Sequence, residues 1–139
     1  MYSRKTQLTL FLSNQPGQFA EVCDLLFSRG VDILAMSATA ESEYGVARLL
    51  VDDVPAALVA LEENGIRVLQ TEVLVAEVAN RSGMAAGIGH RLAQAGVNIE
   101  YTYFTGGERD HTSMMVFKVY DEDLDRALEK LGHPTAGYN

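Results

Sequence analysis

The chain repeats one pattern of residues at an offset of 66, and this internal repeat constrains the fold more than any single motif does. Seven positions carry the same residue in both copies: Asn14, Gly17, Ala20, Leu26, Gly30, Val31 and Ile33 recur as Asn80, Gly83, Ala86, Leu92, Gly96, Val97 and Ile99. Later in each copy the offset becomes 67, which pairs Gly65 with Gly132. Duplication of one supersecondary unit explains the pattern and divides the chain into residues 1–70 and 71–139. Because each copy is near the lower size limit for a stable core, we expect the two to pack together.

Composition excludes several classes of protein. The 139 residues are 47% hydrophobic and 22% charged, which is typical of a globular chain. The formal net charge of -8 opposes binding to nucleic acid, and no cluster of basic residues offsets it. Cys23 is the only cysteine, so an internal disulfide is excluded, and the first residues lack a signal-peptide pattern. With no run of about 20 apolar residues that could span a bilayer, we expect a soluble cytoplasmic protein.

Hydrophobic periodicity predicts the same order of elements in both copies. The first copy is predicted to contain strands at 6–12, 31–40, 45–51 and 66–70, with a turn at 41–43, and helices that begin near Gly17 and Val54 and end at Gly30 and Gly65. The second copy repeats this order through 71–79, 83–95, 97–104, 112–120 and 121–131. After Gly132 only HPTAGYN remains, and this tail lacks apolar alternation. The pattern therefore leaves open whether the second copy completes its final strand.

The order strand, helix, strand, strand, helix, strand is the split βαβ arrangement. It predicts an α+β protein made of two ferredoxin-like βαββαβ units, each with an antiparallel sheet and both helices on one face.

The residues around the first helix carry a resemblance to a known family. The sequence Asn14-Gln15-Pro16-Gly17, followed by a helix that ends at Gly30-Val31-Asp32-Ile33, resembles the ACT domain, a small ligand-binding module that commonly regulates amino-acid metabolism. The second copy is similar but has Ser82 where the family usually has proline. The resemblance covers about the whole chain as two tandem units, including the segment 99–103, and leaves little room for a catalytic domain. It implies a stand-alone regulatory protein that binds a free amino acid at an interface between ACT units.

The turn before each first helix also has the physical properties of a carboxylate site. Pro16 fixes the entry to the helix and Gly17 allows close approach, so free backbone amides would face an anion. In the fold that the resemblance implies, we expect the start of the second strand across from this turn, where Asp32 would bind an ammonium and Asn98 either end of a zwitterion. The alternative is an ordinary turn, with Asp32 and Asn98 satisfying local backbone groups. Recurrence in both copies favours the ligand site. Pro16 favours binding by the first copy and Asn98 by the second.

The predicted ligand-binding residues occupy equivalent segments of the two copies. They are Asn14, Gln15, Pro16, Gly17, Asp32 and Ile33 in the first copy, and Asn80, Arg81, Ser82, Gly83, Asn98, Ile99 and Tyr101 in the second. For Tyr101, a place in the pocket and a place in the core or a subunit interface are equally supported.

No pattern in the chain predicts catalysis, a metal site or a cofactor. The glycines of Gly83–Gly89 do not have the spacing of a dinucleotide loop, so we expect this helix to pack closely on the sheet or on a neighbouring chain. None of His90, His111 and His133 has a second histidine or cysteine at metal-ligand spacing. Cys23 lies on an apolar stripe, where an inert thiol is expected. We therefore predict a protein that is not an enzyme.

The leading hypothesis is a non-catalytic protein that senses a free amino acid and signals through changed assembly or changed affinity for a regulated enzyme. Exposed sheet edges in such small units predict a homodimer. The rival hypothesis is a structural or protein-interaction module that uses the same surfaces for oligomerisation and binds no metabolite. Neither the amino acid nor the regulated enzyme is identified by the sequence.

Overall fold

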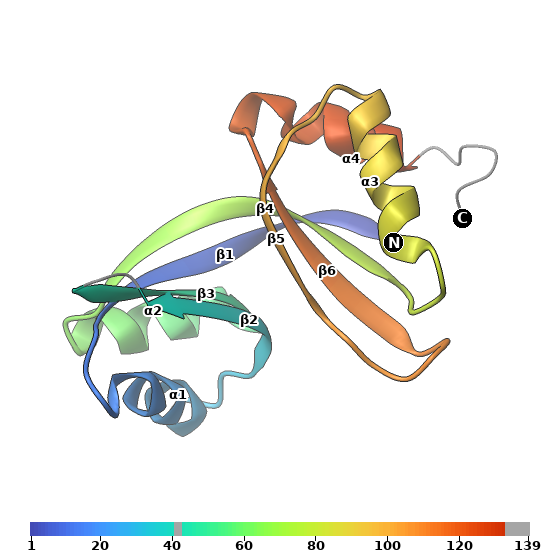
Figure 1. Cartoon of the computed structure of the whole chain (residues 1–139). Coiled ribbons are helices and arrows are strands. Elements are labelled where there is room, and N and C mark those ends of the chain that lie inside the picture. Colours follow the sequence, from blue (N-terminus) through green and yellow to red (C-terminus); the bar gives the residue numbers. More distant parts are fainter. Residues whose placement is uncertain (41–42, 133–139) are drawn as a thin grey trace. The chain divides into compact units, whose positions relative to one another are not determined.

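The computed structural model describes residues 1–40 and 43–132 and contains the predicted helices and strands in order, except that the strands predicted at 66–70 and 71–79 form one strand (Figure 1). The elements are β1 (Tyr2–Ser13), α1 (Gln18–Ser28), β2 (Ile33–Ala40), β3 (Tyr44–Val51), α2 (Val54–Glu63), β4 (Arg67–Ala79), α3 (Met84–Gln94), β5 (Ile99–Thr105), β6 (Thr112–Val119), the 3-10 helix η1 (Asp121–Asp123) and α4 (Leu124–Gly132). Most of the predicted turn at 41–43, His133 and the rest of the tail lie outside the described residues.

The strands are hydrogen-bonded in the order β2-β3-β1-β4-β6-β5, and the chain divides into two compact units. The N-unit is Thr6–Thr71, and the C-unit joins Met1–Lys5 to Glu72–Asn139. The N-unit has the strand order β2-β3-β1-β4 and the C-unit the order β5-β6-β4-β1, so each has the order of a ferredoxin-like sheet. The predicted fold class, two antiparallel ferredoxin-like units, is confirmed.

The long strands β1 and β4 each contribute residues to both units. The predicted boundary at residue 70 falls inside β4, which continues without a break from Arg67 to Ala79. In the C-unit, Met1–Lys5 lies at the edge beside β4, and the backbones of Met1 and Glu77 exchange two hydrogen bonds of 2.7 and 2.8 Å. This segment occupies the position that β4 itself occupies in the N-unit. The first residues of the chain therefore supply the fourth strand of the second copy.

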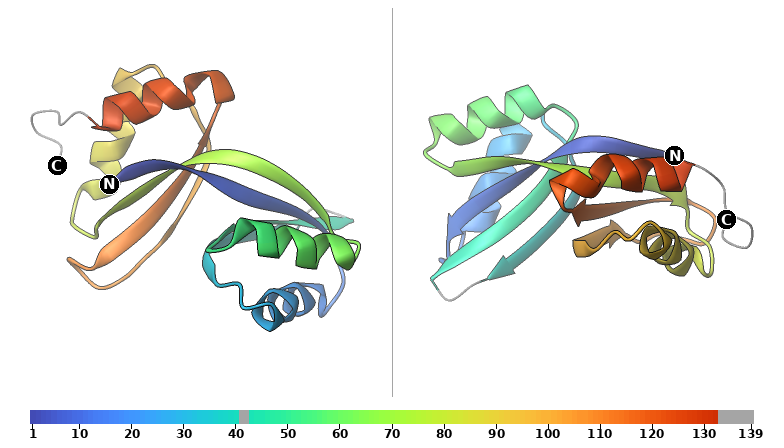
Figure 2. Two further views of the ribbon diagram at one scale, coloured as in Figure 1. Left: turned by 180° about the vertical axis from the view of Figure 1, so that it is seen from behind. Right: turned by 90° about the horizontal axis from the view of Figure 1, so that it is seen from above.

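In the N-unit, both helices lie on the same side of that unit's strands (Figures 1 and 2). Alternate residues of β1 and β3 point to this side, as the period of two requires. Val22 and Leu26 of α1 and Ala57 and Leu61 of α2 close the core over them. The buried core residues are Leu8, Leu10, Val22, Leu26, Val31, Ala47, Leu49, Val51, Ala57 and Leu61.

The C-unit repeats this packing with α3 and α4. Ile88 and Leu92 of α3 and Ala127 and Leu131 of α4 pack on alternate residues of β4 and β6. The buried core residues are Leu74, Ala76, Ile88, Leu92, Val97, Met115, Phe117, Val119, Leu124, Ala127 and Leu131.

The helix ends follow local sequence rules that are the same in both units. The helix α1 ends at Gly30 in a left-handed conformation (φ 71), and Val31 N donates to Leu26 O at 3.0 Å. The equivalent bond from Val97 N to Leu92 O closes α3. These are Schellman motifs, which favour glycine because an L side chain is strained at positive φ. Within the described residues, no helix is long and apolar enough to cross a membrane.

Candidate functional site

A cavity of about 210 Å³ lies in the N-unit where β1 ends and α1 begins. The turn after β1 and the first residues of α1 form one wall, and the end of β2 and the start of β3 form the other. The lining residues are Leu12, Ser13, Asn14, Gln15, Gln18, Phe19, Ala38, Thr39, Ala40, Gly45, Val46 and Ala47. The structure thus brings two predicted ligand residues, Asn14 and Gln15, to the wall of a cavity.

The turn between β1 and α1 places the amino-terminal end of α1 at this cavity. Gly17 is the N-cap residue with φ 88, and its carbonyl oxygen accepts a hydrogen bond from Glu21 N at 2.9 Å. Gln18 N donates to Gln15 O at 3.3 Å, but no side chain caps the helix, so the next backbone amides of its first turn are available to solvent or to a ligand. Asn14 and Gln15 are exposed beside it. The partial positive charge of a helix amino terminus favours a carboxylate here.

The same turn in the C-unit has the same backbone but different side-chain contacts. Gly83 is left-handed with φ 82, so Ser82 in place of proline leaves the turn unchanged. However, Asn80 Nδ2 donates to Gly107 O at 2.7 Å, and Arg81 Nε donates to Asp110 Oδ1 at 3.0 Å. Both predicted ligand residues are therefore engaged by the loop between β5 and β6.

The expectation that Asp32 and Asn98 lie across from these turns is wrong within a single unit. Ser13 pairs with Tyr44 at one end of β3, whereas Ile33 pairs with Val51 at the other end. At about 3.4 Å per residue, the two ends of β3 are roughly 20 Å apart. Exposed Asp32 lies at the far end, where its backbone N–H donates to Asp52 Oδ1 at 2.8 Å.

In the C-unit the second strand also begins at the far end of the sheet. Ile99 pairs with Val119 there, whereas Ala79 pairs with Thr112 next to the turn. Asn98 and Ile99 are exposed, while Ile33 is half-buried and packs against the core of the N-unit. In each unit, the helix between the first two strands carries the chain back to the end of the sheet at which the first strand begins. The second strand therefore starts at the end opposite the turn.

Tyr101 lies on β5 opposite Lys118 and is half-buried, also remote from the turn of its unit. Lys118 Nζ lies 3.2 Å from Glu100 Oε2 and 3.2 Å from Asp121 Oδ1. Burial by itself would lower the pKa of Lys118, but hydrogen bonds and charge attraction from these two carboxylates outweigh burial and raise it. Tyr101 therefore lies next to a lysine that forms ion pairs with Glu100 and Asp121.

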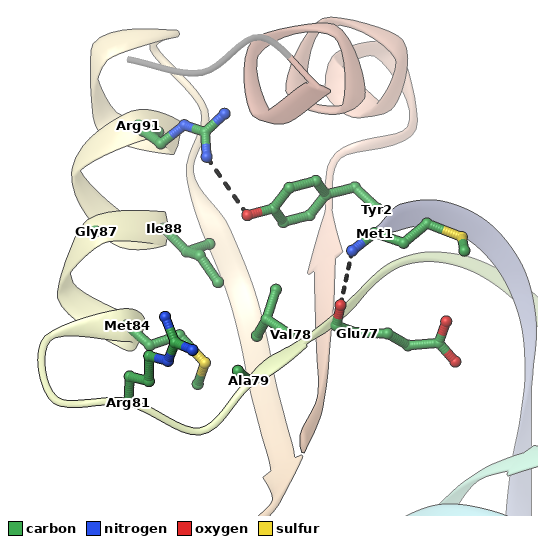
Figure 3. Close-up of a pocket in the computed structure, with 10 residues that line it drawn as sticks. All are labelled: Met1, Tyr2, Glu77, Val78, Ala79, Arg81, Met84, Gly87, Ile88 and Arg91. Carbon is green, nitrogen blue, oxygen red and sulfur yellow. Dashed lines mark hydrogen bonds between the residues drawn. The ribbon is translucent and has the colours of Figure 1, made fainter. Parts of the chain in front are cut away.

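A second cavity, of about 330 Å³, lies in the C-unit between α3, the end of β4 and the start of β1 (Figure 3). Its most unusual residue is Arg91 of α3, because this charged residue is only 6% exposed. Arg91 Nη1 donates to the Tyr2 hydroxyl at 3.4 Å, and its guanidinium lies 5.6 Å from the centre of the Tyr2 ring. Nη2 donates to the carbonyl oxygens of Lys130, at 3.2 Å, and Leu131.

Arg91 is not among the residues predicted from the sequence. A signal was present, because Arg91 lies between Ile88 and Leu92 on the apolar side of its helix and aligns with Leu25 of the first copy. A charge at a core position of an amphipathic helix indicates a buried partner or site. Within the described residues, no group of three or more metal-ligating side chains is present.

Comparisons with known proteins agree with this architecture. The family model described as an ACT domain pair matches residues 4–131. Protein BT0572 from Bacteroides thetaiotaomicron has a similar structure, with a TM-score of 0.85 and 27% identity over 94% of this chain and 88% of that one. The regulatory subunits of aspartate kinase from Thermus thermophilus, in a ligand-free form, and Thermus flavus share the fold, with TM-scores of 0.66 and 0.62, identities of 18% and 20%, and 94% coverage of both chains in each comparison. No curated protein matches significantly.

Proposed function

Given that this chain belongs to the family of ACT domain pairs, we propose that it is a non-catalytic regulatory protein that binds a free amino acid at the turn of the N-unit. The observation that carries the proposal is the cavity in which Asn14 and Gln15 flank the uncapped start of α1. The amides of the helix bind the carboxylate, and the amide side chains of Asn14 and Gln15 hydrogen-bond to the amino acid. The N-unit is preferred because Asn80 and Arg81 are engaged within the C-unit.

In this proposal, the ammonium group of the amino acid is bound by Asp32 of a second chain. Asp32 lies roughly 20 Å from the turn of its own unit, a distance no single amino acid spans. The strand β2 is an edge strand, with Leu34 and Met36 40% and 38% exposed, and such edges favour pairing with another copy.

Two-fold symmetry determines how two β2 strands pair. The pairing must be antiparallel, so the start of one β2 lies beside the end of the other. Ala40 at the end of β2 lines the cavity, and Asp32 of the second chain therefore comes next to it. The site is complete only in the homodimer, so ligand binding and assembly are thermodynamically linked. A change in dimer stability then alters affinity for a regulated partner enzyme. The cytoplasmic location expected from the sequence stays a prediction.

A thermal-shift screen of the full chain against the twenty amino acids tests ligand binding. A ligand at about 100 times its dissociation constant adds about 2.7 kcal/mol to the free energy of unfolding, which raises the midpoint by roughly 10 °C. We expect Asn14→Ala to abolish this shift and Asn80→Ala, its equivalent in the C-unit, to retain it. A screen without any shift would refute the proposal and favour a module that only assembles.

Mixed dimers test the shared site. Asn14→Ala and Asp32→Asn each abolish binding when every chain carries the substitution. A heterodimer of the two variants has one site with both residues intact and one with neither. Isothermal titration of the mixture should therefore show that binding returns, with one site for each heterodimer of two chains. If the site were built within one chain, the mixture would not bind the amino acid.

A further inference from the structure

The cavity of the C-unit is separate from the proposed amino-acid site of the N-unit. Among the residues that line it, only Arg81 was predicted from the sequence to bind a ligand. It lies against the inner side of α3, within one compact unit (Figure 3). Its volume of about 330 Å³ is at the lower end of the range for small-molecule pockets. The lining residues are Met1, Tyr2, Glu77, Val78, Ala79, Arg81, Met84, Gly87, Ile88 and Arg91.

Apolar side chains form the body of this cavity. Val78 of β4 and Met84 and Ile88 of α3 point toward one another across it in Figure 3, with Ala79 beside them. Gly87 removes a side chain from the facing turn of the helix. A surface of this kind binds an aliphatic group and releases water from it.

The polar end of the cavity is built from Tyr2 and Arg91. The Tyr2 hydroxyl accepts a hydrogen bond from Arg91 Nη1, which leaves the hydroxyl proton to be donated to a ligand. Arg91 adds a positive charge that is more than nine-tenths buried. An anion at this end is favoured because charge attraction is stronger where water is excluded. The carboxylate of Glu77 points away from the cavity in Figure 3, so the lining offers no evident partner for an ammonium group.

We propose that this cavity binds a small monocarboxylate with an apolar body, whose carboxylate accepts a hydrogen bond from Tyr2 under the positive charge of Arg91. The ligand class differs from that of the N-unit site because no ammonium group is required. The chain would then respond to an amino acid at one site and to an apolar carboxylic acid at another. This inference does not depend on the proposed function of the N-unit.

The test uses three probes of the same carbon skeleton with the full-length chain: 4-methylpentanoate, 4-methylpentan-1-ol and leucine. NMR titration with 15N-labelled protein should show saturable binding of 4-methylpentanoate in the millimolar range, with shifts concentrated in α3 and the end of β4. The alcohol, which lacks the charge, should bind about tenfold more weakly or worse. Leucine, whose added ammonium group has no carboxylate partner in the lining, should not cause these shifts.

Two variants locate the site. Tyr2→Phe keeps the ring but removes the donor, and should weaken 4-methylpentanoate binding about tenfold. Ala79→Leu fills the cavity and should abolish binding, while Ala93→Leu, at an exposed position of α3 outside the lining, should leave binding unchanged. Unliganded melting curves verify that each variant is folded. The proposal is overturned if 4-methylpentanoate does not saturate, if the alcohol binds equally well, or if Tyr2→Phe retains full affinity.

Discussion

Substituting alanine for two glycines six residues apart should change stability in opposite directions. Gly83 is the N-cap of α3 with φ 82, whereas Gly89 is inside the same helix without a positive φ. Apart from the adjoining backbone, a Cβ at either glycine would have no atom within 4 Å among the described residues. Steric contact with the surroundings is therefore absent at both positions, and only the backbone conformation distinguishes them.

The magnitudes follow from that conformation. Alanine at a left-handed position costs about 1–2 kcal/mol, which the smaller entropy of the unfolded chain offsets by about 0.4–1 kcal/mol. Gly83→Ala should therefore destabilise the protein by about 1 kcal/mol. Gly89→Ala should stabilise it by about 0.5–1 kcal/mol, because alanine is the better helix former. At roughly 4 °C per kcal/mol for a chain of this size, the two midpoints should differ by about 6–8 °C.

Urea denaturation followed by circular dichroism measures both free energies, and the m-value should stay constant. Gly83→Asn is the control, since asparagine tolerates the left-handed region and should cost less than alanine. Changes of the same sign in the two alanine variants would refute the conformational argument. A destabilising Gly89→Ala that depends on protein concentration would instead show that this part of α3 packs against another chain.

Three further outcomes follow from burial and charge. Leu92→Ala should destabilise by about 3 kcal/mol in urea denaturation, because the fully buried Leu92 leaves a cavity in the C-unit core. The raised pKa of Lys118 means that its pairs with Glu100 and Asp121 stabilise fully below its unfolded pKa of about 10.4 and are lost as pH rises through the folded pKa. Lys118→Met should remove this loss of stability above about pH 10.4, as measured by thermal melts. Burial, with a smaller contribution from the charge of Asp24, raises the pKa of Cys23, so alkylation of the thiol at pH 8 should be slower in the folded chain than in urea.

Residues close in sequence made the helices predictable. The second helix was predicted to begin near Val54, and it begins there with Asp53 as its N-cap, whose Oδ1 accepts a hydrogen bond from Ala56 N at 3.0 Å. The glycines that end α1 and α3 are both left-handed, as the repeat predicted. Such features depend on a few neighbouring residues, and the same local sequence therefore produces them in both copies.

Strand boundaries were less predictable because pairing over long sequence distances decides them. The segments 66–70 and 71–79 were predicted as two strands, but β4 runs through both. The first strand was predicted at residues 6–12, from the partial alternation of polar and apolar residues there. It begins at Tyr2 because the backbone of β4 forms hydrogen bonds with residues that lie more than 70 positions earlier in the chain.

The sequence by itself determined the repeat, the order of the elements, the glycine-ended helices and the family, since each follows from local periodicity or a short motif. Only the tertiary structure decided that Asp32 lies at the opposite end of the N-unit from Asn14, that Met1–Lys5 completes the C-unit, and that Arg91 is buried beside Tyr2. These last features join residues that are up to 89 positions apart. No local pattern encodes such a contact, because it forms only when the sheet brings its strands and helices together.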